Sequence, residues 1–288
     1  MPSAEYQIVQ LRNGSFSLRS LAAGETFHPV IGPAAEADTL YVRQLRLVER
    51  VREAAGSEFV VWDVGLGGAA NALAALHATQ ALDCSLRLLS FDRTLEPLRF
   101  ALENSAALGY FAGYEALVRD LHSANEASST RGTQRIRWTA LVTDFPTFIT
   151  ESPIGADDGH PPPHAILFDP FSPAANPAMW TLPVLGALHA WLDPARPCAL
   201  ATYSRATMIR VALLLAGFFV GRGLATGEKE ETTLAANSTA LLDAPLDRRW
   251  LDRARRSGAA EPLAGPHYQR APLRDETWEK LRGHPQFA

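Results

Sequence analysis

The segment 59–78 places a strand, a glycine turn and a helix in direct succession. Its first six residues, FVVWDV, form an apolar run that predicts a buried strand, and GLGG at 65–68 then bends the chain. The alanine-rich residues 69–78 predict a helix. Strand, glycine turn and helix in this order begin a parallel βαβ unit, which confines the chain to an α/β fold.

The same alternation continues along the chain. Further strands are predicted at 86–91, 137–142, 165–168 and 198–202. Helices are predicted between them, at 95–108, 183–192 and 205–216. Short apolar segments at 218–220 and 232–236 flank a polar, glycine-containing connection and predict a hairpin at the sheet edge. We therefore expect a Rossmann-like, mostly parallel sheet of seven strands with helices on both faces.

Both ends of the chain differ from this central pattern. Asn13-Gly14 suits a tight turn, so the opening segment should be a small β-hairpin, and 41–54 has apolar residues at helical spacing. After Pro245 the chain is rich in arginine and should pack on the domain or become ordered on a partner. We divide the chain into a hairpin and first helix at 1–56, a Rossmann-like domain at 57–244, and a basic C-terminal tail at 245–288.

Charge and cysteine content narrow the setting. A formal net charge of −4 and a pI near 6.1 argue against a protein that grips long stretches of phosphate, although a local basic patch can lie within that sum. The two cysteines, Cys84 and Cys198, are far apart in sequence, which favours a reduced, cytoplasmic location. No apolar run approaches the roughly 20 residues that cross a bilayer, so we expect no membrane association. The oligomeric state does not follow from the sequence.

The glycine turn predicts a nucleotide-containing cofactor. Gly65 and Gly67 let the backbone approach a ligand without a Cβ in the way, and the following helix offers unpaired N–H groups. Together with Ala70 they satisfy the dinucleotide pattern G-x-G-x-x-A, and Asp92 follows at about the expected distance for a ribose ligand. The turn alone does not distinguish a nicotinamide dinucleotide from S-adenosylmethionine.

Acids at four successive strand ends favour S-adenosylmethionine. Asp63 stands two residues before the first glycine, where a carboxylate suits a sulfonium and an amino group better than a pyrophosphate. Asp92 could accept hydrogen bonds from the ribose hydroxyls, and Asp144 from the adenine amino group. Asp169 ends the fourth strand. Each acid alone is more often a solvated turn residue, whereas four together indicate one site.

The stretch after Asp169, PFSPAANPAMW, predicts a stiff loop. Its three prolines cannot continue a ladder or a helix interior, so the chain must leave the sheet, and Phe171 and Trp180 give the loop apolar bulk. Ligands of open α/β sheets bind beyond the carboxyl ends of the strands, so an acid followed by this loop predicts a catalytic lip. The alternative is that Asp169 caps a turn and the aromatic residues belong to the core.

These residues resemble the methyltransferase domain family of the tRNA 5-methylaminomethyl-2-thiouridine biosynthesis proteins. The stretch FDPFSPAANPAMW is similar to that family's L-D-G-F-A-P-x-K-N-P-x-M-W, and VGLGGAAN is similar to its G-F-G-T-G-L-N turn. Weaker similarity covers roughly residues 10 to 240. The chain departs from the pattern at Ala69 and Pro170, where the family has glycine, and at Ala175, where it has lysine.

The resemblance implies a Rossmann-like class I methyltransferase that binds S-adenosyl-L-methionine and methylates the aminomethyl group on the wobble uridine of tRNA. Some members carry a flavin-dependent oxidoreductase domain that prepares this amine. We expect a stand-alone methyltransferase here, because 288 residues leave no room for that domain, and a separate flavin oxidoreductase as the source of the amine.

The resemblance and the strand-end acids together assign the site. Asp169 and Phe171 are the predicted catalytic residues, with Asp169 accepting a hydrogen bond from the attacking nitrogen and orienting its lone pair. The predicted cofactor ligands are Asp63, Gly65, Gly67, Asp92 and Asp144. The predicted acceptor pocket contains Pro173, Asn176, Trp180, His28 and Tyr41, the last two closing over the cofactor from the N-terminal segment. We assign no metal ligand.

Several alternatives stay open. The acceptor could be a small-molecule or protein amine instead of tRNA. A nicotinamide oxidoreductase would use the G-x-G-x-x-A match but leaves Asp63 and the DPFSP loop unexplained. A degenerate, non-catalytic fold that serves as a binding module is compatible with the three departures. The basic tail could grip tRNA phosphates or form an ordinary solvated face.

Overall fold

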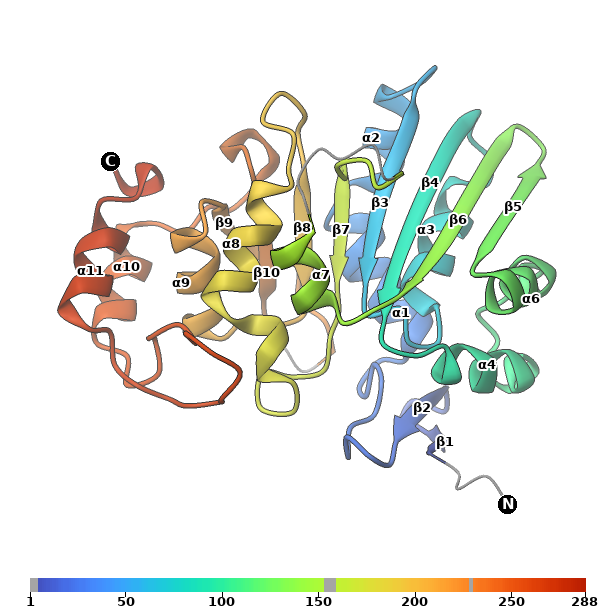
Figure 1. Cartoon of the computed structure of the whole chain (residues 1–288), viewed down its shortest axis with the longest axis horizontal. Helices are drawn as coiled ribbons and strands as arrows, with labels where there is room; N and C mark the ends of the chain where they lie inside the picture. The colour runs from blue at the N-terminus through green and yellow to red at the C-terminus, as the bar shows by residue number, and fades with distance from the viewer. Residues whose placement is uncertain (1–4, 153–158, 228–229) are drawn as a thin grey trace.

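A single sheet of eight strands runs through the computed structural model, which describes residues 5–152, 159–227 and 230–288 (Figure 1). The strand order is β5-β6-β4-β3-β7-β8-β10-β9. The bounds are β3 (Glu58–Val64), β4 (Cys84–Asp92), β5 (Glu126–Arg131), β6 (Gln134–Val142), β7 (Ala165–Phe168), β8 (Ala199–Thr202), β9 (Phe219–Gly223) and β10 (Thr232–Ala236). Strands β6, β4, β3, β7 and β8 are parallel, and β5, β9 and β10 pair antiparallel at the two edges.

The expected Rossmann-like sheet is confirmed, but its predicted seven strands are eight in the described structure. The additional strand is β5, which forms a hairpin with β6 through Gly132, a residue with φ +60°. Its sequence, EASSTR, is polar because the strand lies at the sheet edge, and Ala127 is its one fully buried residue. An edge strand of this kind lacks the apolar run on which the strand predictions depend.

Helices cover both faces of the sheet. One face packs against α1 (Pro33–Ala37), the π-helix η1 (Asp38–Arg43), α2 (Leu47–Glu53), α3 (Ala70–Thr79), α4 (Glu96–Glu103), α5 (Ser105–Leu108) and α6 (Glu115–Ala124). The other face packs against α7 (Phe145–Glu151), α8 (Leu182–Ala190), α9 (Thr207–Leu215), α10 (Arg248–Arg255) and α11 (Asp275–Arg282). The 3₁₀ turns are η2 (Pro177–Trp180), η3 (Thr239–Leu241) and η4 (Pro285–Phe287). Within the described ranges, no helix has the length and apolar character that a bilayer crossing requires.

Two predicted helices are interrupted. The segment 41–54 is divided between η1 and α2, because Arg46 adopts a left-handed backbone with φ +50°. The segment 95–108 is divided at Asn104 into α4 and α5. Helices α6 and α7 were not predicted. The apolar periodicity therefore predicted helical structure in both segments correctly, but it did not predict that each segment is divided into two helices.

The chain order of the strands creates a crevice beside β3. From β3 the chain proceeds to β4 and β6 on one side of the sheet, and it then returns to β7 and β8 on the other side. The connections after β3 and β7 therefore diverge at the carboxyl ends of two adjacent parallel strands. This topological switch point is where open α/β sheets bind their ligands.

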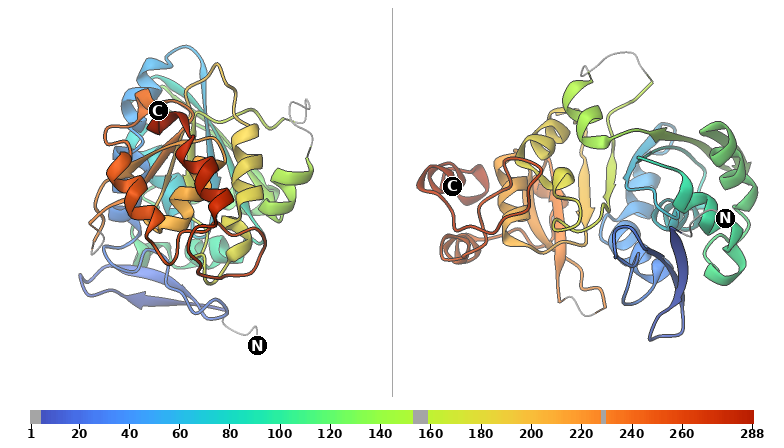
Figure 2. Two further views of the ribbon diagram at one scale, coloured as in Figure 1. Left: turned by 90° about the vertical axis from the view of Figure 1, so that its left-hand side faces the viewer. Right: turned by 60° about the horizontal axis from the view of Figure 1, so that its bottom comes forward.

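The two ends of the chain add to the sheet in different ways. The hairpin of β1 (Tyr6–Gln10) and β2 (Phe16–Ser20) lies beyond the carboxyl ends of the central strands (Figures 1 and 2). The segment 245–288 packs α10 and α11 against the core through Trp250, Leu281 and Phe287. The arginine-rich segment is therefore ordered on the domain. The domain boundaries at 56 and 244 stay predictions.

Candidate active site

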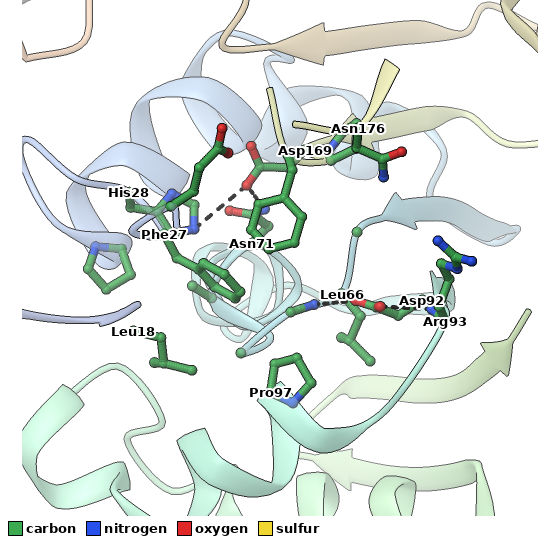
Figure 3. Close-up of a pocket in the computed structure, with 18 of the residues that line it drawn as sticks. Leu18, Phe27, His28, Leu66, Asn71, Asp92, Arg93, Pro97, Asp169 and Asn176 are labelled. Carbon is green, nitrogen blue, oxygen red and sulfur yellow. Dashed lines mark hydrogen bonds and ion pairs between the residues drawn. The ribbon is translucent and has the colours of Figure 1, made fainter. Parts of the chain in front are cut away.

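A cavity of about 600 Å³ occupies the switch point. It is bounded by the turns that follow β3, β4 and β7, by the start of α7, and by the N-terminal segment from Ser17 to Glu36 (Figure 3). Its volume lies within the range of small-molecule sites, roughly 300 to 1,000 Å³. The predicted crevice at the carboxyl edge is therefore enclosed on its open side by the N-terminal segment.

The glycine turn forms one wall of the cavity. Gly65 has φ +96°, and a Cβ there would lie 2.8 Å from the backbone oxygen of Asp169. Gly67 has φ +50°, and a Cβ on it would lie 3.0 Å from the ring of Phe27. Glycine is therefore required at position 65, where the clash is with backbone, and at position 67 it avoids a tight contact with the Phe27 side chain. Ala69 also has a left-handed backbone, with φ +65°, at the position where the family pattern has its third glycine.

Asp92 is tied to this turn. Its Oδ2 accepts a hydrogen bond of 2.9 Å from Gly67 N, and its Oδ1 accepts one of 2.8 Å from Arg93 N. Burial raises the pKa of Asp92, and these backbone hydrogen bonds act in the opposite direction because they stabilise the carboxylate. The carboxylate lines the cavity with lone pairs to spare, as a ligand for ribose hydroxyls must.

Asp144 has a structural role at the far end of the cavity. Its Oδ2 caps α7 by accepting hydrogen bonds from Thr147 N (3.2 Å) and Thr147 Oγ1 (2.8 Å). Its Oδ1 lies 3.4 Å from Nε of Arg93. A contact with a ligand amino group would therefore be added to a helix cap.

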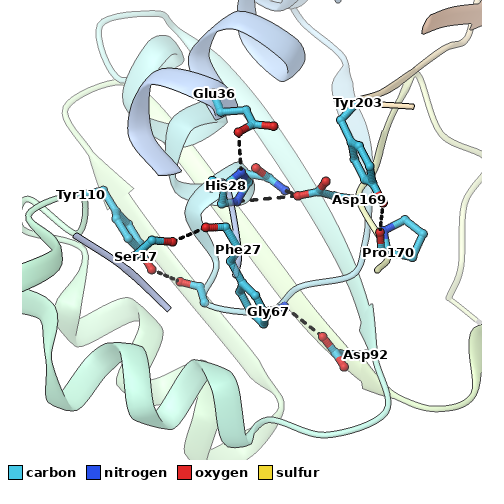
Figure 4. Close-up of polar contacts among 12 residues, drawn as sticks. Ser17, Phe27, His28, Glu36, Gly67, Asp92, Tyr110, Asp169, Pro170 and Tyr203 are labelled. Carbon is cyan, nitrogen blue, oxygen red and sulfur yellow. Dashed lines mark hydrogen bonds and ion pairs between the residues drawn. The ribbon is translucent and has the colours of Figure 1, made fainter. Parts of the chain in front are cut away.

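Asp169 lies where β7, α3 and the N-terminal segment meet. Its Oδ2 accepts a hydrogen bond of 2.8 Å from Asn71 Nδ2 and lies 3.7 Å from Nε2 of His28, whose Nδ1 lies 3.9 Å from Glu36 (Figures 3 and 4). His28 has a left-handed backbone with φ +47°, a conformation that costs about 1 kcal/mol or more for a residue with a Cβ. The surrounding segment thus holds an imidazole between two carboxylates at the cavity.

The loop after Asp169 is held in place by hydrogen bonds to its backbone. Trp180 Nε1 donates to Phe171 O (2.8 Å), and the Tyr203 hydroxyl donates to Pro170 O (2.9 Å). The ring of Phe171 packs edge-on against Phe27, with 5.5 Å between centroids. Ser172 donates to the carboxylate of Glu25 through both its N–H and its hydroxyl. The N-terminal segment and the DPFSP loop thus form one wall.

Eight of the twelve predicted site residues line this cavity. They are His28, Gly65, Gly67, Asp92, Asp144, Asp169, Phe171 and Asn176. The other four, Asp63, Tyr41, Pro173 and Trp180, do not line it. Trp180 is fully buried and supports Phe171 from behind, and Tyr41 is fully buried beside Asp169, whose negative charge adds to burial in raising the Tyr41 pKa. Their predicted roles in binding stay predictions.

Asp63 lies within the sheet below the turn. It is fully buried, and its Oδ2 accepts a hydrogen bond of 2.8 Å from Ser90 Oγ, which in turn accepts one from Trp138 Nε1. Burial raises the pKa of Asp63 to about 7, although the Ser90 hydrogen bond opposes the shift.

Sequence reasoning missed several lining residues. Asn71, Glu25, Glu36 and Phe27 all line the cavity, and none was assigned a role. Asn71 was present in the VGLGGAAN match, where an amide at the second position of a helix could have attracted notice. Glu25 and Phe27 lie on the irregular segment after β2, and Glu36 lies on the short helix α1. In neither place does periodicity indicate which side chains face the cavity.

The cavity suits a cofactor with a positively charged sulfonium. Its glycine turn admits close backbone contact, and the carboxylates of Glu25, Glu36, Asp92 and Asp169 are among the residues that line it. Arg19 and Arg93 also line the cavity, but the carboxylates outnumber them, which favours a cationic group over a pyrophosphate. Comparison with protein families agrees, because residues 115–238 match the profile of a family described as S-adenosyl-L-methionine-dependent methyltransferases.

Over these residues the chain matches this methyltransferase family. No curated protein matches the chain. Solved structures agree with the fold of this methyltransferase. Its fold is similar to that of MnmC2 from Aquifex aeolicus, with a TM-score of 0.69 and 23% identity over 97% of this chain and 83% of that one.

Two further structures share the fold. A spermidine synthase in complex with the transition-state analogue AdoDATO gives a TM-score of 0.53 with 10% identity, covering 97% of this chain and 82% of that one. A probable spermidine synthase from Corynebacterium glutamicum gives 0.51 with 14% identity, covering 93% and 95%. The chain thus shares its Rossmann-like fold both with MnmC2 and with two proteins named as spermidine synthases.

Proposed function

We propose that this methyltransferase transfers a methyl group from S-adenosyl-L-methionine to the 5-aminomethyl group of the wobble (2-thio)uridine in tRNA. The observation that carries the proposal is the position of Asp169, which ends β7 at the cavity and begins the stretch DPFSPAANPAMW. That stretch resembles the tRNA-modifying family. The similarity of fold to MnmC2 supports the same assignment.

The residues of the cavity supply alignment and exclude water. When bound, the cofactor would supply an electrophilic methyl group on a sulfonium, and Gly65, Gly67 and Asp92 would hold it. The acceptor amine must attack as the neutral base, so its proton has to leave and its lone pair has to point at the methyl group. Asp169 accepts one N–H of the amine and thereby sets the direction of the lone pair, while Phe27 and Phe171 exclude water.

The charges around Asp169 favour an acceptor that arrives as a cation. Glu25, Glu36 and Asp169 all line the cavity. Burial is the main cause that raises the Tyr203 pKa, and the negative charges of these three carboxylates raise it further. An aminomethyl group is an ammonium ion in solution near neutral pH. The negative cavity therefore attracts it, and a separate flavin oxidoreductase is the proposed source of the amine.

A second cavity on the same edge of the sheet suits RNA phosphate. It has a volume of about 260 Å³ and is lined by Arg222, Leu246, Asp247, Arg249, Trp250 and Arg253, which we call the arginine groove. Arg222 of β9 pairs with Thr233 of β10, and Thr233 pairs with Thr202, the last residue of β8. Arg222 therefore lies level with the carboxyl ends of the parallel strands, the same end of the sheet as the active-site cavity. Guanidinium groups beside an indole suit phosphate and a stacked base.

Labelled S-adenosylmethionine and total tRNA from cells that lack this protein test the proposal. Nucleoside analysis should find label in 5-methylaminomethyluridine or its 2-thio form. Unlabelled tRNA, with the cofactor still bound, would contradict the tRNA assignment and direct the search to small-molecule or protein amines. Failure to bind the cofactor would instead favour a non-catalytic binding module.

A further inference from the structure

Asn71, at the second position of α3, carries an unpaired buried acceptor beside the cavity. Its side chain lines the cavity, the residue is 4% exposed, and its Oδ1 makes no hydrogen bond within the described structure. A buried amide oxygen without a partner costs about 1 to 3 kcal/mol. Its Oδ1 can therefore accept a hydrogen bond from a donor that enters the cavity.

The orientation of this amide follows from its neighbour. Asn71 Nδ2 donates to Asp169 Oδ2 at 2.8 Å, and a carboxylate only accepts hydrogen bonds. Turning the amide over would place two oxygens against each other, so Asp169 fixes Oδ1 on the opposite side. Figure 3 shows the amide between His28 and Asp169. Two acceptors from different elements, Asn71 Oδ1 on α3 and the Asp169 carboxylate after β7, are thus held at one place.

We propose that Asn71 and Asp169 together bind the amino group of the methyl acceptor, each accepting one of its N–H groups. This inference rests on the proposed amine methylation and names the chemistry that the site selects, a primary amine. A hydroxyl donates one hydrogen bond and could satisfy one acceptor. Glu36 and the Asp169 charge favour a group that arrives as a cation, and a primary ammonium has donors for both acceptors.

Two acceptors also set the outcome of the reaction. Once the ammonium has lost a proton to water, its two remaining N–H groups are held and the lone pair has one direction left. The lone pair forms the new N–C bond as the methyl carbon's bond to sulfur breaks, and the methylated nitrogen then loses a second proton to water. The neutral product has a single N–H, so it leaves one acceptor unpaired. The neutral, reactive form of the product is therefore held less well than that of the substrate, so the site should disfavour a second methyl transfer.

Simple amines test the pair without RNA or cofactor. Dissociation constants of benzylamine, N,N-dimethylbenzylamine and benzyl alcohol would be measured by calorimetry on the full chain, with Asn71→Ala and Asn104→Ala compared. We expect the unaltered protein to prefer benzylamine about tenfold, as the loss of one hydrogen bond implies. Asn71→Ala should reduce this preference to less than about threefold. Asn104 donates to Phe100 O at the end of α4, outside the cavity, so its variant should retain the preference.

Two results would overturn the proposal. One is a folded Asn71→Ala protein with unchanged preference for benzylamine. A weaker affinity of that variant for S-adenosylhomocysteine would assign the amide to the cofactor. The other result is an unaltered protein that binds benzylamine and benzyl alcohol with equal affinity, since the two acceptors would then select no amine. Should thermal melting show that Asn71→Ala does not fold, Asn71→Leu supplies a variant of similar volume without an acceptor.

The RNA assay separates this proposal from the proposed function. In the same protein preparation, tRNA methylation would be scored together with the ratio of dimethylated to monomethylated nucleoside, and Asn71→Ala should raise that ratio. Unlabelled tRNA with an Asn71-dependent amine preference would contradict the tRNA substrate and keep this proposal. Labelled tRNA with an amine preference independent of Asn71 would do the reverse.

Discussion

Asp169 connects three parts of the chain at a single carboxylate. It ends β7, accepts a hydrogen bond from Asn71 of α3, and lies 3.7 Å from His28 of the N-terminal segment. These contacts fix the carboxylate before any substrate arrives, which is the condition for orienting a lone pair at little entropic cost.

Asp169→Ala tests this role directly. We expect cofactor affinity to change little and the single-turnover methylation rate to fall by about 10² to 10⁴, the usual range for a positioned acid or base. Asp120→Ala removes an exposed acid of α6 and serves as the matched control. Equal turnover by the Asp169 variant and the unaltered protein would remove Asp169 from the reaction.

Asp63 should make stability depend on pH. Its pKa is about 7 in the folded protein against an ordinary 3.8, so the folded state keeps a proton that the unfolded chain releases. The contribution of Asp63 to stability is therefore present below about pH 4, falls as the pH rises, and is lost above about pH 7, a loss on the order of 4 kcal/mol. An asparagine does not titrate, so the Asp63→Asn protein should not lose this stability as the pH rises. The difference in free energy of unfolding between Asp63→Asn and the unaltered protein should therefore favour the variant more at pH 8 than at pH 5. A gain of equal size at both pH values in urea titrations would contradict the assignment.

The residues that sequence could predict are those with a position in a repeating pattern. Asp92, Asp144 and Asp169 follow strands, and parallel strands bring their carboxyl ends to one edge, so their convergence was predictable. Asp63 differs from these acids, because it lies inside β3 and is fully buried, and its predicted role in cofactor binding stays a prediction. Glu25 and Glu36 reach the cavity through an irregular segment whose path depends on tertiary contacts.

At the scale of elements, the β3–α3 turn depends on backbone conformation. Gly65 has φ +96°, and its Cα packs against the backbone at Asp169, just after β7. A side chain at position 65 would prevent the turn and the DPFSP loop from packing together. Sequence predicted this turn well because glycine at such a position has a single physical reason. It predicted the helices of 41–54 and 95–108 less well, since nothing in the periodicity marks the breaks at Arg46 and Asn104.

A pair of glycine substitutions measures this dependence. Gly65→Ala should lower the free energy of unfolding by more than about 2 kcal/mol, because it adds a 2.8 Å clash with Asp169 O to a strained backbone. Gly186→Ala lies within α8 with no atom within 4 Å of the new Cβ, so it should raise stability by about 0.5 to 1 kcal/mol. Thermal melting compares the two. Similar stability of both variants would show that the turn tolerates a side chain.

At the scale of the whole molecule, charge is distributed unevenly. The net charge of −4 excludes a broad phosphate-binding surface, yet the arginine groove gathers Arg222, Arg249 and Arg253 on β9 and α10. The same groove also contains the carboxylate of Asp247, so three guanidinium groups face one acid. The negative active-site cavity and the positive groove open at one edge of the sheet, so one RNA could present its amine to the first and its backbone to the second.

Arg249→Ala and Arg253→Ala test whether the groove binds RNA phosphate. Each variant should weaken tRNA binding and reduce the slope of log affinity against log salt by about 0.7 to 0.9 if its guanidinium contacts one phosphate. Arg52→Ala removes an exposed arginine of α2, on the edge of the sheet opposite the cavity, and should leave the slope unchanged (Figure 1). Methylation of a small amine should be unaffected in all three variants, because the groove is separate from the cavity that contains Asp169. A salt slope that changes equally in the Arg52 and Arg249 variants would mean that the groove has no special part in binding, and the RNA would then have to approach the active site across another surface.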